Sequence, residues 1–191
     1  MTTAATSADR WADPLYARRI DLARRGDENG FAALVREHQD QLYRVALRMV
    51  GDPQDAQDAV QEAFLQAWQH LPSFRGDAQF LTWITRILLN RCSNLIRSRR
   101  PAGRLPESDS EREAPRTQGA EIVAVAAHTR DAVRRAVLSL PVDQRAPLVL
   151  TTFAGYTHAE AGRILGISEN AAKVRAHRAR RALSSVLEEW R

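Results

Sequence analysis

The chain has 191 residues and a mass of 21.4 kDa, enough for one ordinary domain or two small ones. Hydrophobic residues make up 44% and charged residues 27%, which is the composition of a globular rather than a disordered protein. The formal net charge of +5 favours a polyanionic partner such as a nucleic acid.

Two further features restrict the class of protein. The sequence contains no apolar run near the ~20 residues that cross a bilayer, and its first residues lack the basic start and apolar stretch of a secretory signal. Cys92 is the single cysteine, so an intramolecular disulfide and a cysteine-based metal site are both excluded. We therefore expect a cytoplasmic protein without membrane insertion.

Helical periodicity runs through the first half of the chain. Apolar residues recur at steps of three and four from Phe31 to Met49, as on one face of an amphipathic helix. The Gly51-Asp52-Pro53 segment ends this helix and begins the next. That next helix has an apolar stripe of Ala56, Ala59, Val60, Ala63, Phe64, Ala67 and Trp68.

A third helix is predicted from about Ala78 to Arg99, after a loop over residues 71–77 that contains Pro and Gly. Its apolar face is predicted to bury Phe80, Trp83, Ile84, Ile87 and Leu88. Short connections between the three helices predict a compact bundle.

The second half is predicted to be a separate helical domain. Residues 101–119 are rich in Pro and polar residues and read as a flexible linker, so the domains are placed at 10–100 and 120–191. A helical stripe extends from Ile122 to Leu140, and a new helix begins at 141–143, where Pro147 is expected to kink or shorten it.

The end of the chain has the pattern of a helix-turn-helix. The first helix is predicted from His158 to Leu165, with a turn at Gly166-Ile167. Ser168 is the expected N-cap of the last helix. The fold class predicted from the whole pattern is all-α.

No catalytic constellation is visible in the sequence. The five histidines are scattered, and there is no glycine-rich phosphate loop or nucleophile elbow. Cys92 is read as a small packing residue rather than as a nucleophile. We therefore expect no enzymatic activity, no metal and no cofactor.

Three charged clusters remain as candidate sites. Asp55, Asp58 and Glu62 share one helix face, either as a solvated surface or as a docking face for a basic partner. Arginines between residues 75 and 104 are interleaved with Phe74, Phe80 and Trp83, a combination that single-stranded nucleic acid binding requires. Burial statistics favour the core for Phe80 and Trp83, whereas Phe74 lies in the predicted loop.

The third cluster lies on the last helix. Basic side chains at 173, 177, 180 and 181 share a face and could enter a DNA major groove together. The helix and turn that precede them favour duplex DNA as the ligand.

These motifs resemble those of a known family, the extracytoplasmic-function (group IV) sigma factors of bacterial RNA polymerase. The segments DAQDAVQEAFLQAW and FRGDAQFLTWITRILLN are similar to region 2 of that family, and LSLPVDQRAPLVLTTFAGYTHAEAGRILGISENAAKVRAHRARRAL is similar to region 4. The resemblance implies a protein that binds core RNA polymerase and directs transcription initiation from specific promoters, with promoter DNA and an anti-sigma factor as further partners.

The resemblance also implies roles for individual residues. The β′ clamp helices of the polymerase would contact Asp55, Asp58, Gln61, Glu62 and Phe64, and region 4 would meet the β flap. A flipped base of the −10 element would be captured by Phe74, Arg75, Gly76, Asp77, Arg86 and Asn90. The −35 element would be read by Lys173, Val174, His177 and Arg178, with Arg175 and Arg180 as phosphate contacts.

The sequence departs from the family pattern in its second half. Gly162 stands where the family usually has Ala in the first helix of the helix-turn-helix, at a cost of about 1 kcal/mol relative to Ala. Ala171-Ala172 replaces the usual Thr-Val pair, and Pro147 is unusual in its helix. These departures concern the stability of this domain and its −35 sequence preference.

Two other classes of function are weighed against this one. A free-standing helix-turn-helix regulator that dimerises through its first half would bind a palindromic operator without polymerase. A DNA-processing enzyme such as a recombinase would need a nucleophile or a carboxylate cluster, and neither is visible.

Overall fold

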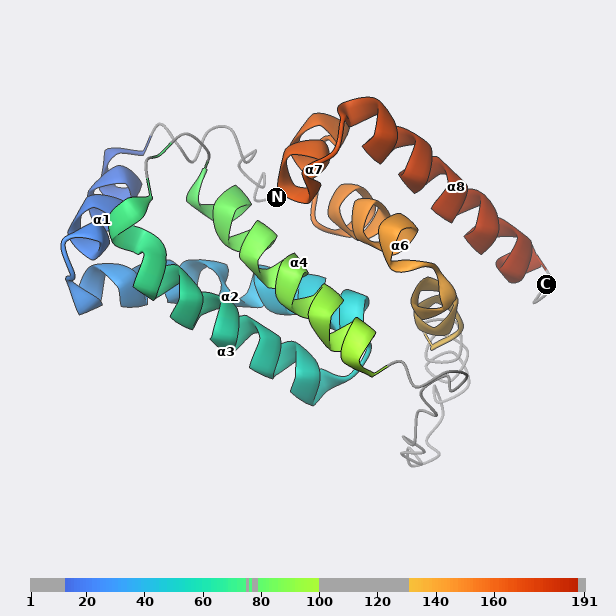
Figure 1. Cartoon of the computed structure of the whole chain (residues 1–191), viewed down its shortest axis with the longest axis horizontal. Helices are drawn as coiled ribbons and strands as arrows, with labels where there is room; N and C mark the ends of the chain where they lie inside the picture. Colours follow the sequence, from blue (N-terminus) through green and yellow to red (C-terminus); the bar gives the residue numbers. More distant parts are fainter. Residues whose placement is uncertain (1–12, 75, 77–78, 100–130, 189–191) are drawn as a thin grey trace, which may run out of the picture.

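The computed structural model describes residues 13–74, 76, 79–99 and 131–188, with side chains up to residue 184. The described residues form helices and turns in two groups (Figure 1), with α1 to α4 in one and α6 to α8 in the other. The all-α prediction is confirmed for these residues. The predicted linker 101–119 and the stripe from Ile122 to Ala126 lie outside them.

In the described part of the N-terminal domain, four α-helices, α1 (Pro14–Arg24), α2 (Glu28–Val50), α3 (Pro53–His70) and α4 (Phe80–Ser98), are accompanied by a short 3-10 helix, η2 (Leu71–Ser73). Asp52 is the N-cap of α3, where its carboxylate accepts a 2.9 Å hydrogen bond from the Asp55 backbone N–H. Gly51 ends α2 with a φ of +87°, a left-handed conformation that favours glycine. The predicted break at 51–53 is therefore confirmed.

The helix α1 was not predicted from the apolar pattern. Its start nevertheless carries a sequence signal, because Asp13 caps it and Pro14 occupies its first turn. Tyr16 attaches α1 to α2 through a 2.8 Å hydrogen bond between its hydroxyl and His38 Nε2, and both side chains are buried.

Large side chains fill the core of the N-terminal domain. Phe80 is fully buried and lies against the rings of His38, Phe74 and Trp83. The predicted core stripes of α3 and α4 are confirmed in most positions: Ala56, Ala59, Val60, Ala63, Phe64, Ala67, Ile84 and Leu88 are buried. Trp83 and Ile87 are half-buried.

The described part of the C-terminal domain contains helical residues 131–139, followed by α6 (Val142–Leu148), η3 (Val149–Phe153), α7 (His158–Leu165) and α8 (Glu169–Glu188). Pro147 is buried inside α6, and the α-helical hydrogen-bond pattern ends one residue later. The chain then makes a turn of π-helix in η3. The predicted shortening at Pro147 is confirmed, because proline has no N–H to donate and its ring crowds the preceding turn.

The helix-turn-helix has the predicted bounds. Thr157 caps α7 in a reciprocal arrangement with Glu160, and Gly166 turns the chain with a φ of +67°. The Ser168 hydroxyl accepts a 3.1 Å hydrogen bond from the Ala171 backbone N–H, which confirms Ser168 as the N-cap of α8.

Gly162 has a packing role that its helix propensity does not reveal. A Cβ at this position would lie 2.8 Å from the Ile167 carbonyl oxygen and 3.2 Å from the Glu169 nitrogen. Because both atoms belong to the backbone of the turn, a side chain at Gly162 would push α7 away from the start of α8. The reading of Gly162 as a simple cost is therefore wrong.

Candidate nucleic-acid and partner interfaces

The acidic face of α3 is partly neutralised by arginines of α4. Arg91 Nε lies 2.6 Å from Glu62 Oε2, and Arg99 is ion-paired with Asp55 through both carboxylate oxygens. Asp55 is 9% exposed, and burial raises the pKa of its carboxyl while Arg99 opposes that shift. Of the three predicted acids, Asp58 presents its charge most openly.

The exposed part of this face includes a residue that the sequence analysis missed. Asp58, Gln61 and Leu65 are exposed and lie at positions i, i+3 and i+7 of α3, so they share one side of the helix. The Leu65 side chain is 56% exposed. We define Asp58, Gln61 and Leu65 as the α3 face.

Phe64 lies beneath the surface. It is 7% exposed, and its ring meets that of Phe31 edge-on at 6.2 Å between centroids. The prediction that Phe64 contacts a partner is corrected here, because its position in the apolar stripe of α3 directs it between α3 and α2. Its burial was visible in the helical periodicity.

The loop before α4 does not present an open aromatic ring. Phe74 is 8% exposed, and its ring centroid lies 5.0 Å from that of Trp83 and 6.3 Å from that of Phe80. The prediction that Phe74 offers a free stacking face is therefore corrected. Gly76 is exposed, whereas Arg75 and Asp77 lie outside the described residues.

Polar side chains follow one exposed line along α4. Arg86, Asn90 and Asn94 are exposed at four-residue steps, which places them on one side of the helix. Asn94 was missed, because an asparagine in a helix carries no charge signal. Asn90 is about 10 Å along the axis from Trp83, the neighbour of Phe74, at 1.5 Å per residue, so the structure separates it from the Phe74 ring.

The last helix presents its predicted basic face to solvent. Lys173, Val174, His177 and Arg178 are exposed, as is Arg180, whereas Arg175 is half-buried. The opposite face is buried through Ala172, Ala176 and Ala179. The α8 side chains expected to face base edges thus lie on the outside of the domain, as does Arg180, whereas Arg175 is partly covered.

Other chemistry is not supported in the part of the chain that the structure describes. Burial raises the pKa of the Cys92 thiol to about 12, so it stays protonated at neutral pH and fits the predicted packing role. The described residues contain no cluster of three or more His, Cys, Asp or Glu side chains placed to hold a metal ion. None of the described helices is long and apolar enough to span a membrane.

Comparisons with known proteins agree with this arrangement. The family model of sigma-70 region 2 matches residues 34–102, and that of sigma-70 region 4 matches residues 130–183. The chain is 38% identical over 162 residues to the ECF RNA polymerase sigma factor SigM of Mycobacterium tuberculosis, covering 85% of this chain and 79% of SigM. It is 32% identical to SigW of Bacillus subtilis, covering 91% of this chain and 97% of SigW.

Two solved structures give the same result for the fold. CnrH in complex with the cytosolic domain of CnrY aligns with a TM-score of 0.68 and 29% identity, over 90% of this chain and 96% of CnrH. The sigma factor RpoE of Bartonella quintana, in complex with the anti-sigma factor NepR, aligns with a TM-score of 0.63 at 21% identity, over 83% and 96%.

These matches define a two-domain sigma factor of the sigma-70 class. The chain belongs to the ECF sigma factors, and it is an alternative sigma factor that directs promoter-specific transcription by RNA polymerase. The members it matches are transcription initiation factors. The family expected from the sequence is confirmed.

Proposed function

We propose that the chain binds core RNA polymerase through the α3 face, contacts the −10 strand along α4, and reads the −35 duplex with α8. The observation that carries this proposal is that the basic face of α8 and the α3 face are both exposed on separate domains. One chain can therefore contact a polymerase and a promoter together. The domains assigned to these roles are residues 10–100 and 120–191, joined by 101–119.

Docking to the polymerase is tested best at Asp58. Asp55 and Glu62 are held by Arg99 and Arg91, so reversing them would also disturb the contact between α3 and α4. Asp58→Arg replaces attraction by repulsion toward a basic partner, and we expect at least a tenfold loss of affinity for core polymerase. Asp40→Arg, an exposed acid on α2, is the matched control. Equal affinities for the two variants would refute the assignment of the α3 face.

Substitutions on α8 can distinguish base contacts from phosphate contacts at the −35 element. Arg178→Ala should cost about 1 to 3 kcal/mol and relax the preference at one base pair. Arg180→Ala should weaken binding to all promoters alike and reduce its salt dependence. Binding of the holoenzyme to a set of single-base −35 variants distinguishes the two. If Arg178→Ala lowers the affinity equally for every promoter variant, Arg178 contacts only phosphate.

Promoter opening is assigned to the polar line on α4. Unstacking one base costs a few kcal/mol, and the amides of Asn90 and Asn94 can return part of that cost by hydrogen bonds to a base edge. We expect Asn90→Ala to impair opening of duplex promoters more than transcription from a template with a mismatched bubble at −10. Because the ring of Phe74 is buried, Phe74→Ala would also lower the stability of the fold. This variant must therefore be assayed both for promoter opening and for stability. Normal opening by Asn90→Ala would exclude this role.

We further propose that the protein acts in the cytoplasm, where RNA polymerase lies, without enzymatic activity of its own, and that an anti-sigma factor regulates it. Support comes from the shared fold of RpoE, which is bound by the anti-sigma factor NepR, and of CnrH, which is bound by the cytosolic domain of CnrY. A palindromic operator bound without polymerase would instead favour the free-standing regulator.

A further inference from the structure

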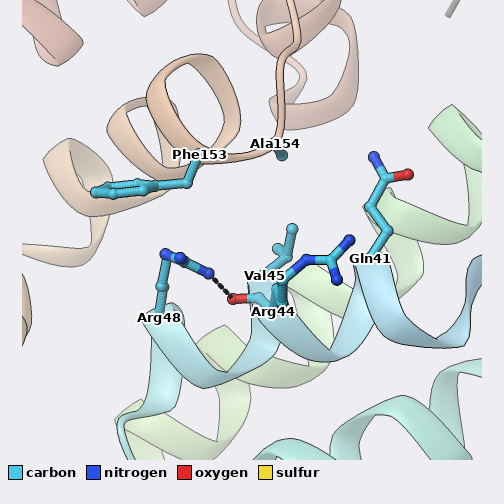
Figure 2. A pocket seen from close by; sticks show the side chains of 6 residues that line it. All are labelled: Gln41, Arg44, Val45, Arg48, Phe153 and Ala154. Atoms are coloured by element: carbon cyan, nitrogen blue, oxygen red, sulfur yellow. Dashed lines mark hydrogen bonds between the residues drawn. The ribbon is translucent and has the colours of Figure 1, made fainter. Parts of the chain in front are cut away.

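A cavity of about 200 Å³ lies where α2 meets the C-terminal domain (Figure 2). Its lining comes from α2, from the end of η3 and from the residue after it: Gln41, Arg44, Val45, Arg48, Phe153 and Ala154. Gln41, Arg44 and Arg48 occupy positions i, i+3 and i+7, so their side chains leave the same side of α2. One wall of the cavity is therefore a polar side of α2, and the other is the segment at Phe153 and Ala154.

Buried hydrogen bonds near the cavity form the junction between the two domains. Arg145 of α6 donates a 2.5 Å hydrogen bond to the carbonyl of Met49, the residue after Arg48. The hydroxyls of Thr85 and Tyr156 lie 3.0 Å apart, and Tyr156 follows Ala154 by two positions. The lining residues on both walls are therefore next to fixed points of the structure.

The ionisable residues of the lining are both cations. Arg44 and Arg48 have no carboxylate among the residues that line the cavity with them, and within the described part of the chain neither forms an ion pair. Asp40 is exposed one turn before Arg44 on α2, without an ion pair to it. Like charges at i and i+4 of a helix repel each other. An anion between the two guanidinium groups would replace this repulsion by attraction.

Arg48 is held in one orientation at the cavity. The side chain is half-buried, and its Nη1 donates a 3.0 Å hydrogen bond to the Arg44 carbonyl. Its guanidinium also lies over the Phe153 ring, 4.6 Å from the ring centroid. Burial and the nearby Arg44 charge lower the pKa of Arg48. The backbone carbonyl takes one of the five N–H donors of a guanidinium, so this oriented group can still donate to a further acceptor.

Size and chemistry restrict the ligand that this lining can take. The volume is below the roughly 300 Å³ at which pockets begin to take drug-sized ligands, so the enclosed group is compact. Two guanidinium forks match the oxygens of a phosphate, which can accept paired hydrogen bonds from each. The Gln41 amide can add one more donor. A doubly charged anion would also balance both arginines at once.

We propose that this cavity binds a phosphate dianion between Arg44 and Arg48, either as free phosphate or as the phosphoryl group of a small monoester. In the monoester case the organic part would leave through the open side of the cavity. The site shares no residue with the α3 face or with the basic side chains of α8. Binding there requires neither polymerase nor promoter, so it does not rest on the proposed function.

The first test measures binding to the full chain by isothermal titration calorimetry, with ionic strength held constant by sodium chloride. Inorganic phosphate and glycerol 3-phosphate are the two probes. We expect one saturable site per chain for at least one of them. Tighter binding of glycerol 3-phosphate would identify a monoester as the ligand, and tighter binding of inorganic phosphate would identify the free ion. No saturable binding of either probe would overturn the proposal.

Substitutions locate the binding in the cavity. Arg44→Gln and Arg48→Gln each remove a charged donor, and we expect each to raise the Kd about tenfold or more. Arg44→Lys keeps the charge but not the planar fork, and the expected rise is about threefold. Arg44 is exposed, so its variants should keep the parent fold, which thermal unfolding by circular dichroism checks.

Arg36→Gln is the matched control, because it removes the same charge from an exposed position on the same helix. Its Kd should stay within about twofold of the parent. Equal losses for Arg36→Gln and Arg44→Gln would show attraction to the net positive chain and overturn the proposal. Unchanged binding by both Arg44→Gln and Arg48→Gln would overturn it as well.

The second test separates a small dianion from a nucleic-acid strand. Dimethyl phosphate carries one charge and represents the phosphodiester of a backbone, and we expect it to bind about tenfold more weakly than the better probe. The affinity for a single-stranded oligothymidylate should change no more in Arg44→Gln than in Arg36→Gln. A larger loss in Arg44→Gln would assign these arginines to a DNA-contacting surface and overturn the proposal.

Discussion

The two domains achieve their packing in opposite ways. The N-terminal domain is filled by large side chains such as Phe80, Leu34, Leu42 and Met49, all fully buried. In the C-terminal domain, α8 presents only small side chains inward in its first turns, at Ala172, Ala176 and Ala179. The core of the first domain therefore depends on large side chains. The contact of α8 depends on small ones, although Leu148, Val149 and Leu150 are fully buried elsewhere in the C-terminal domain. We therefore expect truncation of a large core side chain to destabilise the N-terminal domain, and enlargement of an inward side chain of α8 to destabilise the C-terminal domain.

Removing volume from the N-terminal domain should have the largest effect. Phe80→Ala would leave a cavity among His38, Phe74 and Trp83, and we expect a loss of about 3 to 5 kcal/mol in the free energy of unfolding. Urea denaturation of the full chain, monitored by circular dichroism, measures this loss of stability. A loss below 1 kcal/mol would mean that the ring cluster can collapse around the gap.

Adding volume to the C-terminal domain should come next. Ala176→Leu inserts a branched side chain where α8 has none, and overpacking of this kind costs about 1 to 3 kcal/mol. Ser184→Leu, on the exposed side of α8, serves as the control and should be nearly neutral. If Ala176→Leu leaves stability unchanged, the contact of α8 has spare room and the comparison between the domains fails.

The junction between the domains should respond to alkaline pH. Burial raises the pKa of Tyr156 to about 12, above its ordinary value near 10. Because the unfolded chain releases this proton first, the stability from Tyr156 is complete below pH 10 and falls by up to about 1.4 kcal/mol per pH unit toward pH 12. Tyr156→Phe should flatten the stability profile in that window. Tyr43→Phe, half-buried on α2, provides the comparison, and identical profiles for the two variants would contradict the burial of Tyr156.

The smallest change concerns Gly162. Ala is favoured over Gly in a helix by about 1 kcal/mol, but a Cβ here meets the Ile167 carbonyl at 2.8 Å, and strain of this kind costs about 1 to 3 kcal/mol. We expect Gly162→Ala to be destabilising by about 1 kcal/mol net and to weaken binding to −35 DNA as α8 shifts. A stabilised variant, seen as a higher Tm, would show that propensity outweighs the contact.

Much of the fold was predictable because its signals are local. The break at 51–53, the bounds of α7 and the cap at Ser168 all depend on hydrogen bonds within a few residues, which residue type determines directly. The exposed basic face of α8 follows from helical periodicity in the same way. The start of α1 carries equally local signals, namely the cap residue Asp13 and Pro14 in the first turn. Apolar periodicity alone does not detect them.

Other features depended on contacts between distant residues. Whether Phe74 is a free ring or part of the core depends on Phe80 and Trp83 of α4, and the pairing of Asp55 joins residues 44 positions apart in sequence. The contact of Arg145 with the Met49 carbonyl spans 96 positions, and no pattern in either segment marks it. The sequence by itself determined which segments are helical and which of their faces carry charge, because those properties arise within one or two turns. Only the tertiary structure decided which charges are neutralised, which rings are covered and how the two domains meet, because burial and pairing are set by the neighbours that the folded chain supplies.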